Sequence, residues 1–269
     1  MATHLHICTP RQGWEWLMSG LALFRKKPSE LFLLGNTYLF LLLFVGMLIP
    51  MLGPAVVTLL TPTLGFGIML AGKMIKSGLR VSPAVLFAGL SPAHRPHLPR
   101  LFQLGFIYTA CFAVIKLLAH ALLGPQPMLD VSNLQKIDPA HIVQFYEYMA
   151  TYLSLVALTS LPVILAFWYA PVLVVWHGMS AGQALFSSWI AVWRNKSAFL
   201  IFGMGWILLS VGFCSAVVAV FSLLGLPASL LGALNILTMA VVMSVSLATF
   251  YPTYTDVFEH DPEHIQTQA

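Results

Sequence analysis

The chain has 269 residues, of which 59% are hydrophobic and 8% are charged, and its formal net charge at pH 7 is +4. Soluble domains carry charged residues at about 25% of their positions, so the composition excludes an ordinary water-soluble fold. Residues 31–72, 148–193 and 197–255 contain no Asp, Glu, Lys or Arg. A helix of about 20 apolar residues crosses the hydrocarbon core of a bilayer, and each stretch is therefore long enough for about two crossings.

These apolar stretches predict transmembrane helices. Only helices and closed barrels satisfy every backbone hydrogen bond in lipid, and the stretches lack the alternation of apolar and polar residues that marks barrel strands. The predicted fold is an all-α, polytopic transmembrane helical bundle of about six spans. In chain order, the predicted spans are 30–49, 54–75, 100–123, 143–170, 198–222 and 228–250.

Basic residues indicate the orientation, because cytoplasmic loops carry an excess of Lys and Arg. An even number of spans puts both termini on one side. Lys136 in the loop 124–142 then lies on the opposite side, and Lys116 lies inside the third span. We therefore expect cytoplasmic termini, and basic loops that attract anionic lipid headgroups rather than nucleic acid. The remaining Lys and Arg residues all fall on the cytoplasmic side: Arg11, Arg25, Lys26, Lys27, Lys73, Lys76, Arg80, Arg95, Arg100, Arg194 and Lys196.

A short repeat emerges when residue 13 is aligned with residue 182. The segments GWEWLMSGLALFRKK and GQALFSSWIAVWRNK then share Gly13/Gly182, Ser19/Ser188, Ala22/Ala191, Arg25/Arg194 and Lys27/Lys196. Each segment opens with a capping-box pattern, although the two caps are two residues out of register. We expect two amphipathic helices in the cytoplasmic interface, each leading into a transmembrane hairpin. A pair of unrelated surface helices, common in polytopic proteins, is the alternative. The expected anchors at headgroup level are Trp14, Trp16, Arg25, Lys27, Trp189, Trp193, Arg194 and Lys196.

The repeat also predicts how the chain is organised. A single transmembrane domain, 1–255, contains repeat one at 9–76, a central hairpin at 98–175 and repeat two at 180–255. An acidic cytoplasmic tail, 256–269, follows. The two repeated segments have the same orientation, which suggests a pseudo-twofold axis along the membrane normal rather than an inverted repeat.

Polar residues at membrane depth are the candidate functional residues. Lys116 and His120 lie one turn apart in the third span, and Glu147 lies at a similar depth in the fourth. A Lys116–Glu147 ion pair is one hypothesis, and the alternative is that both side chains extend separately to the outer interface. Asn36 and Asn235 are interpreted as bonding between helices. Helix kinks are expected at Pro62, Pro162 and Pro171, where they either line a substrate path or serve packing.

Motifs for catalysis are missing from the sequence. It contains no Walker-type glycine loop, no zinc-protease signature, no nucleophile elbow and no paired carboxylates at depth. We therefore expect a protein that is not an enzyme. His4, His6 and Cys8 have a spacing that suits a soft metal, but a terminal segment with three chance ligands explains them better, and neither a metal nor a cofactor is expected.

Three segments carry a resemblance to a known family. The segments are GWEWLMSGLALFRKKPSELF at 13–32, LTPTLGFGIMLAG at 60–72, and YAPVLVVWHGMSAGQAL at 169–185 followed by Arg194 and Asn195. They resemble a group of uncharacterised betaproteobacterial inner-membrane proteins. More distantly, the layout is similar to YciC-like proteins and to the membrane domains of some glycerophosphodiesterases. The resemblance implies a bacterial inner-membrane location and transfers no catalytic residue.

Two functional hypotheses follow. The first is a non-catalytic accessory, assembly or scaffold component that contacts the lipid bilayer and either a membrane-protein partner or a second copy of the chain. The second is a permease, or a transporter of lipids or other amphiphiles, with a path between the two repeated hairpins. The second hypothesis requires a polar-lined cavity near Asn36, Asn235 and Pro62, whereas a tightly packed apolar centre would argue against it.

Overall fold

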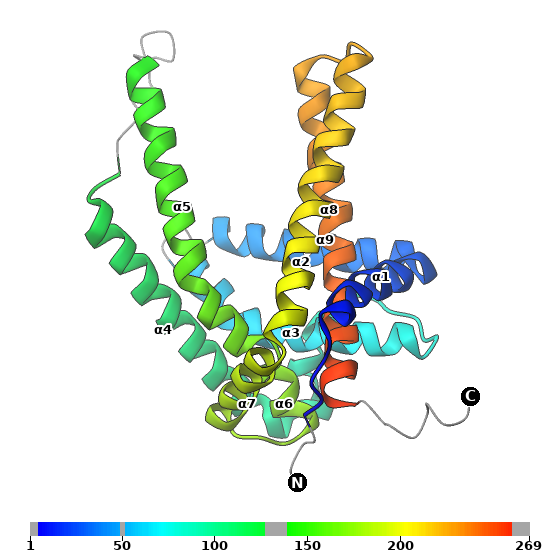
Figure 1. The fold of residues 1–269 in the computed structure, drawn as a ribbon. Helices are drawn as coiled ribbons and strands as arrows, with labels where there is room; N and C mark the ends of the chain where they lie inside the picture. Colours follow the sequence, from blue (N-terminus) through cyan, green and yellow to red (C-terminus); the bar gives the residue numbers. More distant parts are fainter. Residues whose placement is uncertain (1–4, 49–51, 127–138, 260–269) are drawn as a thin grey trace.

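The computed structural model describes residues 5–48, 52–126 and 139–259, and the side chains of residues 139 and 140 are not described. Within these ranges the regular structure is helical throughout, with no strand (Figure 1). Six helices or helix pairs are long and apolar enough to cross a membrane, which confirms the predicted polytopic all-α fold. In chain order, the helices are α1 (Pro10–Lys26), α2 (Pro28–Leu48), α3 (Gly53–Lys76), the 3-10 helices η1 (Pro83–Leu90) and η2 (Pro92–His97), α4 (Leu98–Leu123), α5 (Pro139–Phe167), α6 (Ala170–Trp176), α7 (Ala181–Arg194), α8 (Lys196–Leu223) and α9 (Ala228–Phe258).

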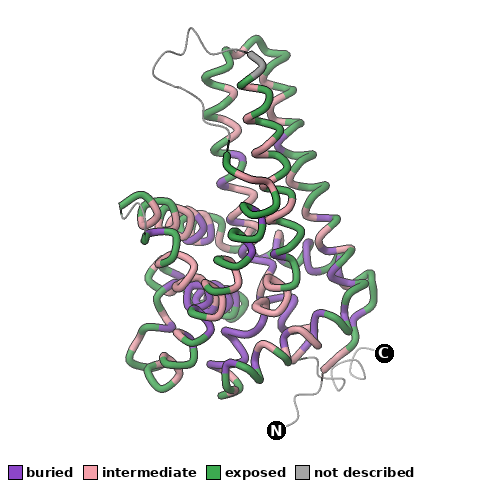
Figure 2. Tube along the Cα trace, turned by 90° about the vertical axis from the view of Figure 1, so that its left-hand side faces the viewer, coloured by how far each residue is buried: buried purple, intermediate pink, exposed green. Residues whose placement is uncertain are grey.

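The long helices form three hairpins: α2–α3, α4–α5 and α8–α9. The α4–α5 and α8–α9 hairpins rise from a common region and diverge toward their tips (Figure 1). The α2–α3 hairpin lies crosswise to α8–α9, and it is seen nearly end-on when the molecule is turned (Figure 2). The hairpins are therefore splayed rather than aligned as one parallel bundle.

Most large buried side chains lie where the hairpins meet (Figure 2). We call this region the base. It consists of α6, α7 and the adjoining parts of α1, α3, α4, α8 and α9. A second buried cluster joins α1, α2, α3, η1 and α9 beside it. Farther along the α4–α5 and α8–α9 hairpins the side chains are mainly exposed, so their outer parts depend on lipid or other helices for cover.

The fourth span differs from the prediction at its C-terminal end. Helix α5 ends at Phe167, and α6 begins at Ala170 after a break in the helix. Pro171 lies in the first turn of α6, where its missing N–H removes no helical hydrogen bond. Pro62 and Pro162, in contrast, lie inside α3 and α5, which continue through them. Of the three expected kink positions, the helix is therefore interrupted only beside Pro171.

The last helix also extends beyond its expected end. Helix α9 continues through Pro252 to Phe258, so the boundary expected at 255/256 falls inside it. Tyr251, Tyr254 and Val257 are buried on the base, and this packing accounts for the extra turns. Asp256 is consequently part of a packed helix and not of an acidic tail. The remainder of the predicted tail, 260–269, lies outside the described residues.

Helix α1 packs closely on the α8–α9 hairpin through glycine. A Cβ atom at Gly13 would overlap the backbone carbonyl of Ala198, and one at Gly20 would overlap the side chain of Thr249. Small residues of this kind let two helix backbones approach each other. Helix α1 is thus held against the last two spans although it precedes the first.

Both helices of the expected repeat are present, each with its capping box, formed by Thr9 with Gln12 and by Ser180 with Gln183. Their buried faces do not match in the aligned register, however. Leu17 is buried, whereas the aligned Phe186 is 67% exposed. The buried positions coincide when the alignment is shifted by one residue, as in the pair Gly20 and Ser188. The two helices therefore share a cap and an amphipathic pattern but pack differently.

Gly13 and Gly182 provide a matched test of this packing. Gly13→Ala should lower the free energy of unfolding by about 1–3 kcal/mol, because the added methyl group overpacks the contact with α8. Gly182→Ala should leave it unchanged or slightly higher, because nothing lies within 4 Å of the added atom. Thermal unfolding in detergent measures both effects. Equal losses in the two variants would contradict the described packing of α1.

Candidate functional site

Asn195, between α7 and α8, is the most connected polar side chain of the base. It is fully buried, and its Oδ1 accepts a hydrogen bond of 2.6 Å from the backbone N–H of Cys8. Its Nδ2 donates to the carbonyl oxygens of His6 and Ala191 at 3.1 and 2.9 Å. The side chain therefore ties the N-terminal segment to the start of the fifth span.

Cys8 is shielded from solvent in this arrangement. Its side chain is 3% exposed, and burial, with a smaller contribution from the charge of Asp256, raises the pKa of its thiol to about 12. His6 uses its backbone carbonyl toward Asn195 and its N–H toward Val257. Among the described residues, no group of three or more His, Cys, Asp or Glu side chains is placed to hold a metal ion. His4 lies outside the described residues.

Trp16 and Trp14 occupy different environments. Trp16 is 1% exposed, packs edge-on against Phe199 and Phe202, and donates a hydrogen bond of 2.8 Å from Nε1 to Asp256 Oδ2. Trp14 is 45% exposed. The structure therefore leaves Trp14 on the surface and places Trp16 inside the protein, so Trp16 is not a headgroup anchor.

The other expected anchors lie on the surface of the base. Arg25 and Arg194 are exposed, and Lys27 forms an ion pair of 3.2 Å with Glu30. Trp189 and Trp193 stack on each other at 5.7 Å, and Lys196 Nζ lies 5.2 Å from the ring centre of Trp193. These side chains are available to a membrane surface.

Two further lysines and a histidine contact the aromatic cluster of the base. Lys73 lies over the ring of Trp176 at 4.6 Å, and Lys76 lies over Tyr251 at 5.6 Å. His177 Nε2 forms a hydrogen bond of 2.8 Å with the hydroxyl of Tyr254. Burial lowers the pKa of His177, with a smaller opposing effect from Glu259, so the imidazole stays neutral at pH 7. These polar groups thus make contacts within the protein, whereas the buried Nε1 of Trp206, beside the same cluster, has no hydrogen-bond partner among the described residues.

The residues expected at the outer ends of the third and fourth spans are not brought together. Lys116, His120 and Glu147 are all exposed. The ion pairs within residues 5–48, 52–126 and 139–259 are Arg11–Glu15 and Lys27–Glu30, so Lys116 and Glu147 do not form one. That each side chain extends separately to the membrane interface stays a prediction.

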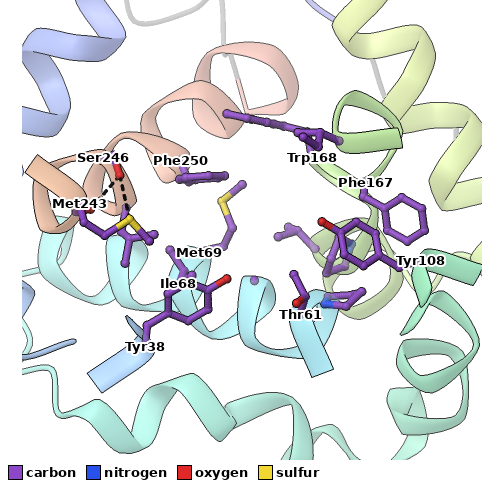
Figure 3. A pocket seen from close by; sticks show the side chains of 16 residues that line it. Tyr38, Thr61, Ile68, Met69, Tyr108, Phe167, Trp168, Met243, Ser246 and Phe250 are labelled. Atoms are coloured by element: carbon purple, nitrogen blue, oxygen red, sulfur yellow. Dashed lines mark hydrogen bonds between the residues drawn. The ribbon is translucent and has the colours of Figure 1, made fainter. Parts of the chain in front are cut away.

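A cavity of 290 Å³ lies between the hairpins, beside Pro62 (Figure 3). Its wall comes from α2, α3, α4, α9 and the junction of α5 with α6. Trp168 and Phe250 stack on each other there at 4.6 Å. The residues that supply most of its surface are aromatic, aliphatic and Met side chains: Tyr38, Ile68, Met69, Tyr108, Ile164, Phe167, Trp168, Val172, Met243, Leu247 and Phe250.

The two candidate asparagines lie outside this cavity. Asn36 donates to the carbonyl oxygen of Phe32 in its own helix at 2.7 Å. Asn235 lines a neighbouring groove on the α8–α9 hairpin, together with Ser210, Cys214 and Ser215. Met243 and Ser246 of α9 line both the groove and the cavity. We call this surface the α8–α9 groove. Within the described part of the chain, the Asn235 side chain has no hydrogen-bond partner, which is costly for an amide at membrane depth.

Several of these residues were not singled out from the sequence. Asn195 follows α7 as its C-terminal cap, and its side chain bonds to residues 6 and 8. The sequence gives no sign of this contact between distant segments. Tyr38 and Tyr108 carried a weak signal, since each is the one tyrosine of a largely apolar predicted span. Their joint position in the cavity depends on how α2 and α4 pack, which periodicity does not specify.

Comparison with known proteins finds a relative over nearly the whole chain. A protein of Burkholderia thailandensis named "Probable inner membrane protein" is 30% identical over 252 residues, which is 92% of this chain and 91% of the relative. No family model and no solved structure matches the chain. The relative agrees with the inner-membrane family expected from the sequence. The distant likeness to YciC-like proteins and to glycerophosphodiesterase membrane domains stays a prediction.

Trp16 and Trp14 allow a paired test of the base. Trp16→Phe should lower the free energy of unfolding by about 1–3 kcal/mol, because it leaves the carboxylate of Asp256 without its donor. Trp14→Phe should change it by less than about 0.5 kcal/mol, as expected for an exposed site. Thermal unfolding in detergent measures both values. A larger loss in Trp14→Phe would show that the two environments are assigned the wrong way round.

Cys8 reports on the contact made by Asn195. In a Cys111→Ser/Cys214→Ser background, Cys8 should react slowly with a maleimide at pH 7, because the reactive thiolate is scarce and covered. Asn195→Ala should speed labelling about five- to tenfold, since it removes hydrogen bonds worth about 0.5–1.5 kcal/mol each. Asn36→Ala is the control and should leave the rate unchanged. Unchanged labelling in Asn195→Ala would rule out this role.

Proposed function

Because this chain belongs to the same family as the probable inner membrane protein of Burkholderia thailandensis, we propose that it is a non-catalytic scaffold of the inner membrane, with both termini in the cytoplasm. In this proposal the base fixes the hairpins, and the α8–α9 groove receives a transmembrane helix of a partner protein or of a second copy. The unpaired amide of Asn235 is the observation that carries the proposal.

The groove has the chemistry of a helix-binding surface. Ser210, Cys214 and Ser215 are small residues of α8, and small residues allow a second helix to approach closely in lipid. Asn235 on α9 adds an amide, which commonly bonds across helices in membranes. Only 6% of the apolar 18-residue stretch of α8 is buried within the protein, so the helix has surface left for such a contact.

The placement of charge also favours a scaffold over a catalyst. Lys73 and Lys76 contact aromatic rings, Asp256 accepts a hydrogen bond from Trp16, and Arg100 donates to the carbonyl oxygen of Gly178. The splayed hairpins carry few polar groups. Such a molecule is suited to holding apolar helices at fixed positions.

The permease hypothesis receives less support. It requires a polar path past Asn36, Asn235 and Pro62, but only Pro62 lines the central cavity. Asn36 bonds within α2, and Asn235 faces the α8–α9 groove. The apolar wall of the cavity does not offer the hydration that a polar solute would need.

The proposed partner contact can be tested by matched substitutions on α8. Wild-type protein solubilised in a mild detergent should be recovered as a complex of defined stoichiometry, measured by light scattering with size-exclusion chromatography and by mass spectrometry. Ser215→Trp should dissociate the complex because it fills the groove. Leu208→Trp should not, because Leu208 is 70% exposed on the same helix but outside the groove. A wild-type protein recovered as a partner-free monomer would refute the scaffold role.

A further inference from the structure

The central cavity beside Pro62 contains hydrogen-bond donors that the protein itself does not use. Thr61 and Ser246 donate to backbone carbonyls of their own helices, and Trp168 donates to Thr253. The hydroxyl groups of Tyr38 and Tyr108 have no hydrogen-bond partner within the described residues. These two phenols are therefore the free polar groups of the cavity wall.

The two hydroxyl groups face the same space. Tyr38 extends from α2 and Tyr108 from α4, and in Figure 3 their hydroxyl groups point inward from opposite sides. A phenol in an apolar environment is destabilised unless its O–H finds an acceptor. An oxygen atom of a bound molecule would supply one to either hydroxyl.

The rest of the wall restricts what that molecule can be. None of the lining residues is Asp, Glu, Lys, Arg or His, so the cavity has no counter-ion for a phosphate, carboxylate or ammonium group. Aromatic rings and the thioethers of Met69 and Met243 favour a neutral, largely apolar body. The wall therefore favours a ligand that accepts hydrogen bonds without carrying charge, as a ketone or ester carbonyl does.

The size and position of the cavity indicate how such a molecule is held. Its volume of 290 Å³ is at the lower end of the range of about 300–1,000 Å³ for small-molecule pockets. It lies among helices that are long and apolar enough to span the membrane. It can hold the head of a lipid, while the chains of that lipid remain in the surrounding bilayer.

We infer that the cavity binds the neutral, carbonyl-bearing head of a membrane lipid, with Tyr38 and Tyr108 donating hydrogen bonds to its oxygens. An acylglycerol and a lipid-soluble quinone share this chemistry. The inference goes beyond the scaffold role and does not depend on the α8–α9 groove.

Photolabelling of the full chain in phospholipid nanodiscs tests the inference. The probe is a diacylglycerol with a diazirine on the first carbons of one acyl chain, next to the ester carbonyl that the cavity is expected to hold. The comparator is a phosphatidic acid with the same modified chain. The diacylglycerol should label peptides that line the cavity, and the phosphatidic acid should label them at least about fivefold less, since burying an unpaired charge is costly. Excess decylubiquinone distinguishes the two kinds of lipid. If it reduces labelling by the diacylglycerol, the cavity accepts a quinone head; if labelling is unchanged, the ligand is an acylglycerol.

Matched variants locate the binding. Tyr38→Phe/Tyr108→Phe should reduce diacylglycerol labelling about tenfold, as expected for two lost hydrogen bonds. Tyr152→Phe, which removes a phenol elsewhere on the α4–α5 hairpin, should not. Gly65→Leu should block the cavity, because Gly65 lines it and its added Cβ meets no atom within 4 Å. Gly46→Leu, at an equally open position outside the cavity, is its control.

The set of labelled peptides shows whether the cavity binds the lipid head. Labelling that persists unchanged in both the double tyrosine variant and Gly65→Leu would overturn the inference, as would equal labelling by phosphatidic acid. So would labelling confined to the outer faces of α8 and α9. The double tyrosine variant keeps its ring packing, so the test remains decisive even if Gly65→Leu fails to fold. The complex measured for the α8–α9 groove is a separate readout, so the two proposals can fail independently.

Discussion

The contact of α1 with α8 and α9 fixes the positions of the other elements. Gly13 and Gly20 let the backbone of α1 touch Ala198 and Thr249, and Trp16 fills the space beside them with its ring against Phe199 and Phe202. Lipid provides no hydrophobic drive between helices, so close packing and hydrogen bonding must supply the stability. The concentration of both at the base explains why the hairpins can diverge beyond it.

Hydrogen-bonding capacity is distributed unevenly over the molecule. At the base, Asn195, Trp16 and His177 all have partners within the protein. On the hairpins, the side chains of Tyr38, Tyr108 and Asn235 have none within the described residues. Polar side chains whose hydrogen bonds are made within the protein stabilise the fold. Polar side chains without a partner, in a low-dielectric setting, are available to bind another molecule. This contrast separates the structural polar residues from the candidates for recognition more clearly than depth in the membrane does.

The sequence indicated the helices well because span length and the absence of charge are local properties. It did not distinguish Trp16 from Trp14, since both belong to one amphipathic segment and only tertiary contact decides which is covered. Kinks were expected alike at Pro62, Pro162 and Pro171, but only Pro171 lies beside a break in the helix. A proline in an apolar run looks the same whether the helix continues or restarts there. The crosswise α2–α3 hairpin and the meeting of Tyr38 with Tyr108 in one cavity depend on packing between distant segments. Patterns within a segment do not encode that packing.

The hydrogen bond between Trp16 and Asp256 joins residues 240 positions apart, and Asn195 reaches Cys8 across 187. A ribosome releases the N-terminal helix long before either partner exists. Helix α1 must therefore wait at the membrane surface until the last hairpin has been inserted, with its buried face covered by something other than its final neighbours. Since long-range contacts form late, the assembled base marks a completed chain. A chain that stops short of α9 lacks Thr249 and Asp256, so the Trp16 side of α1 stays uncovered on that face.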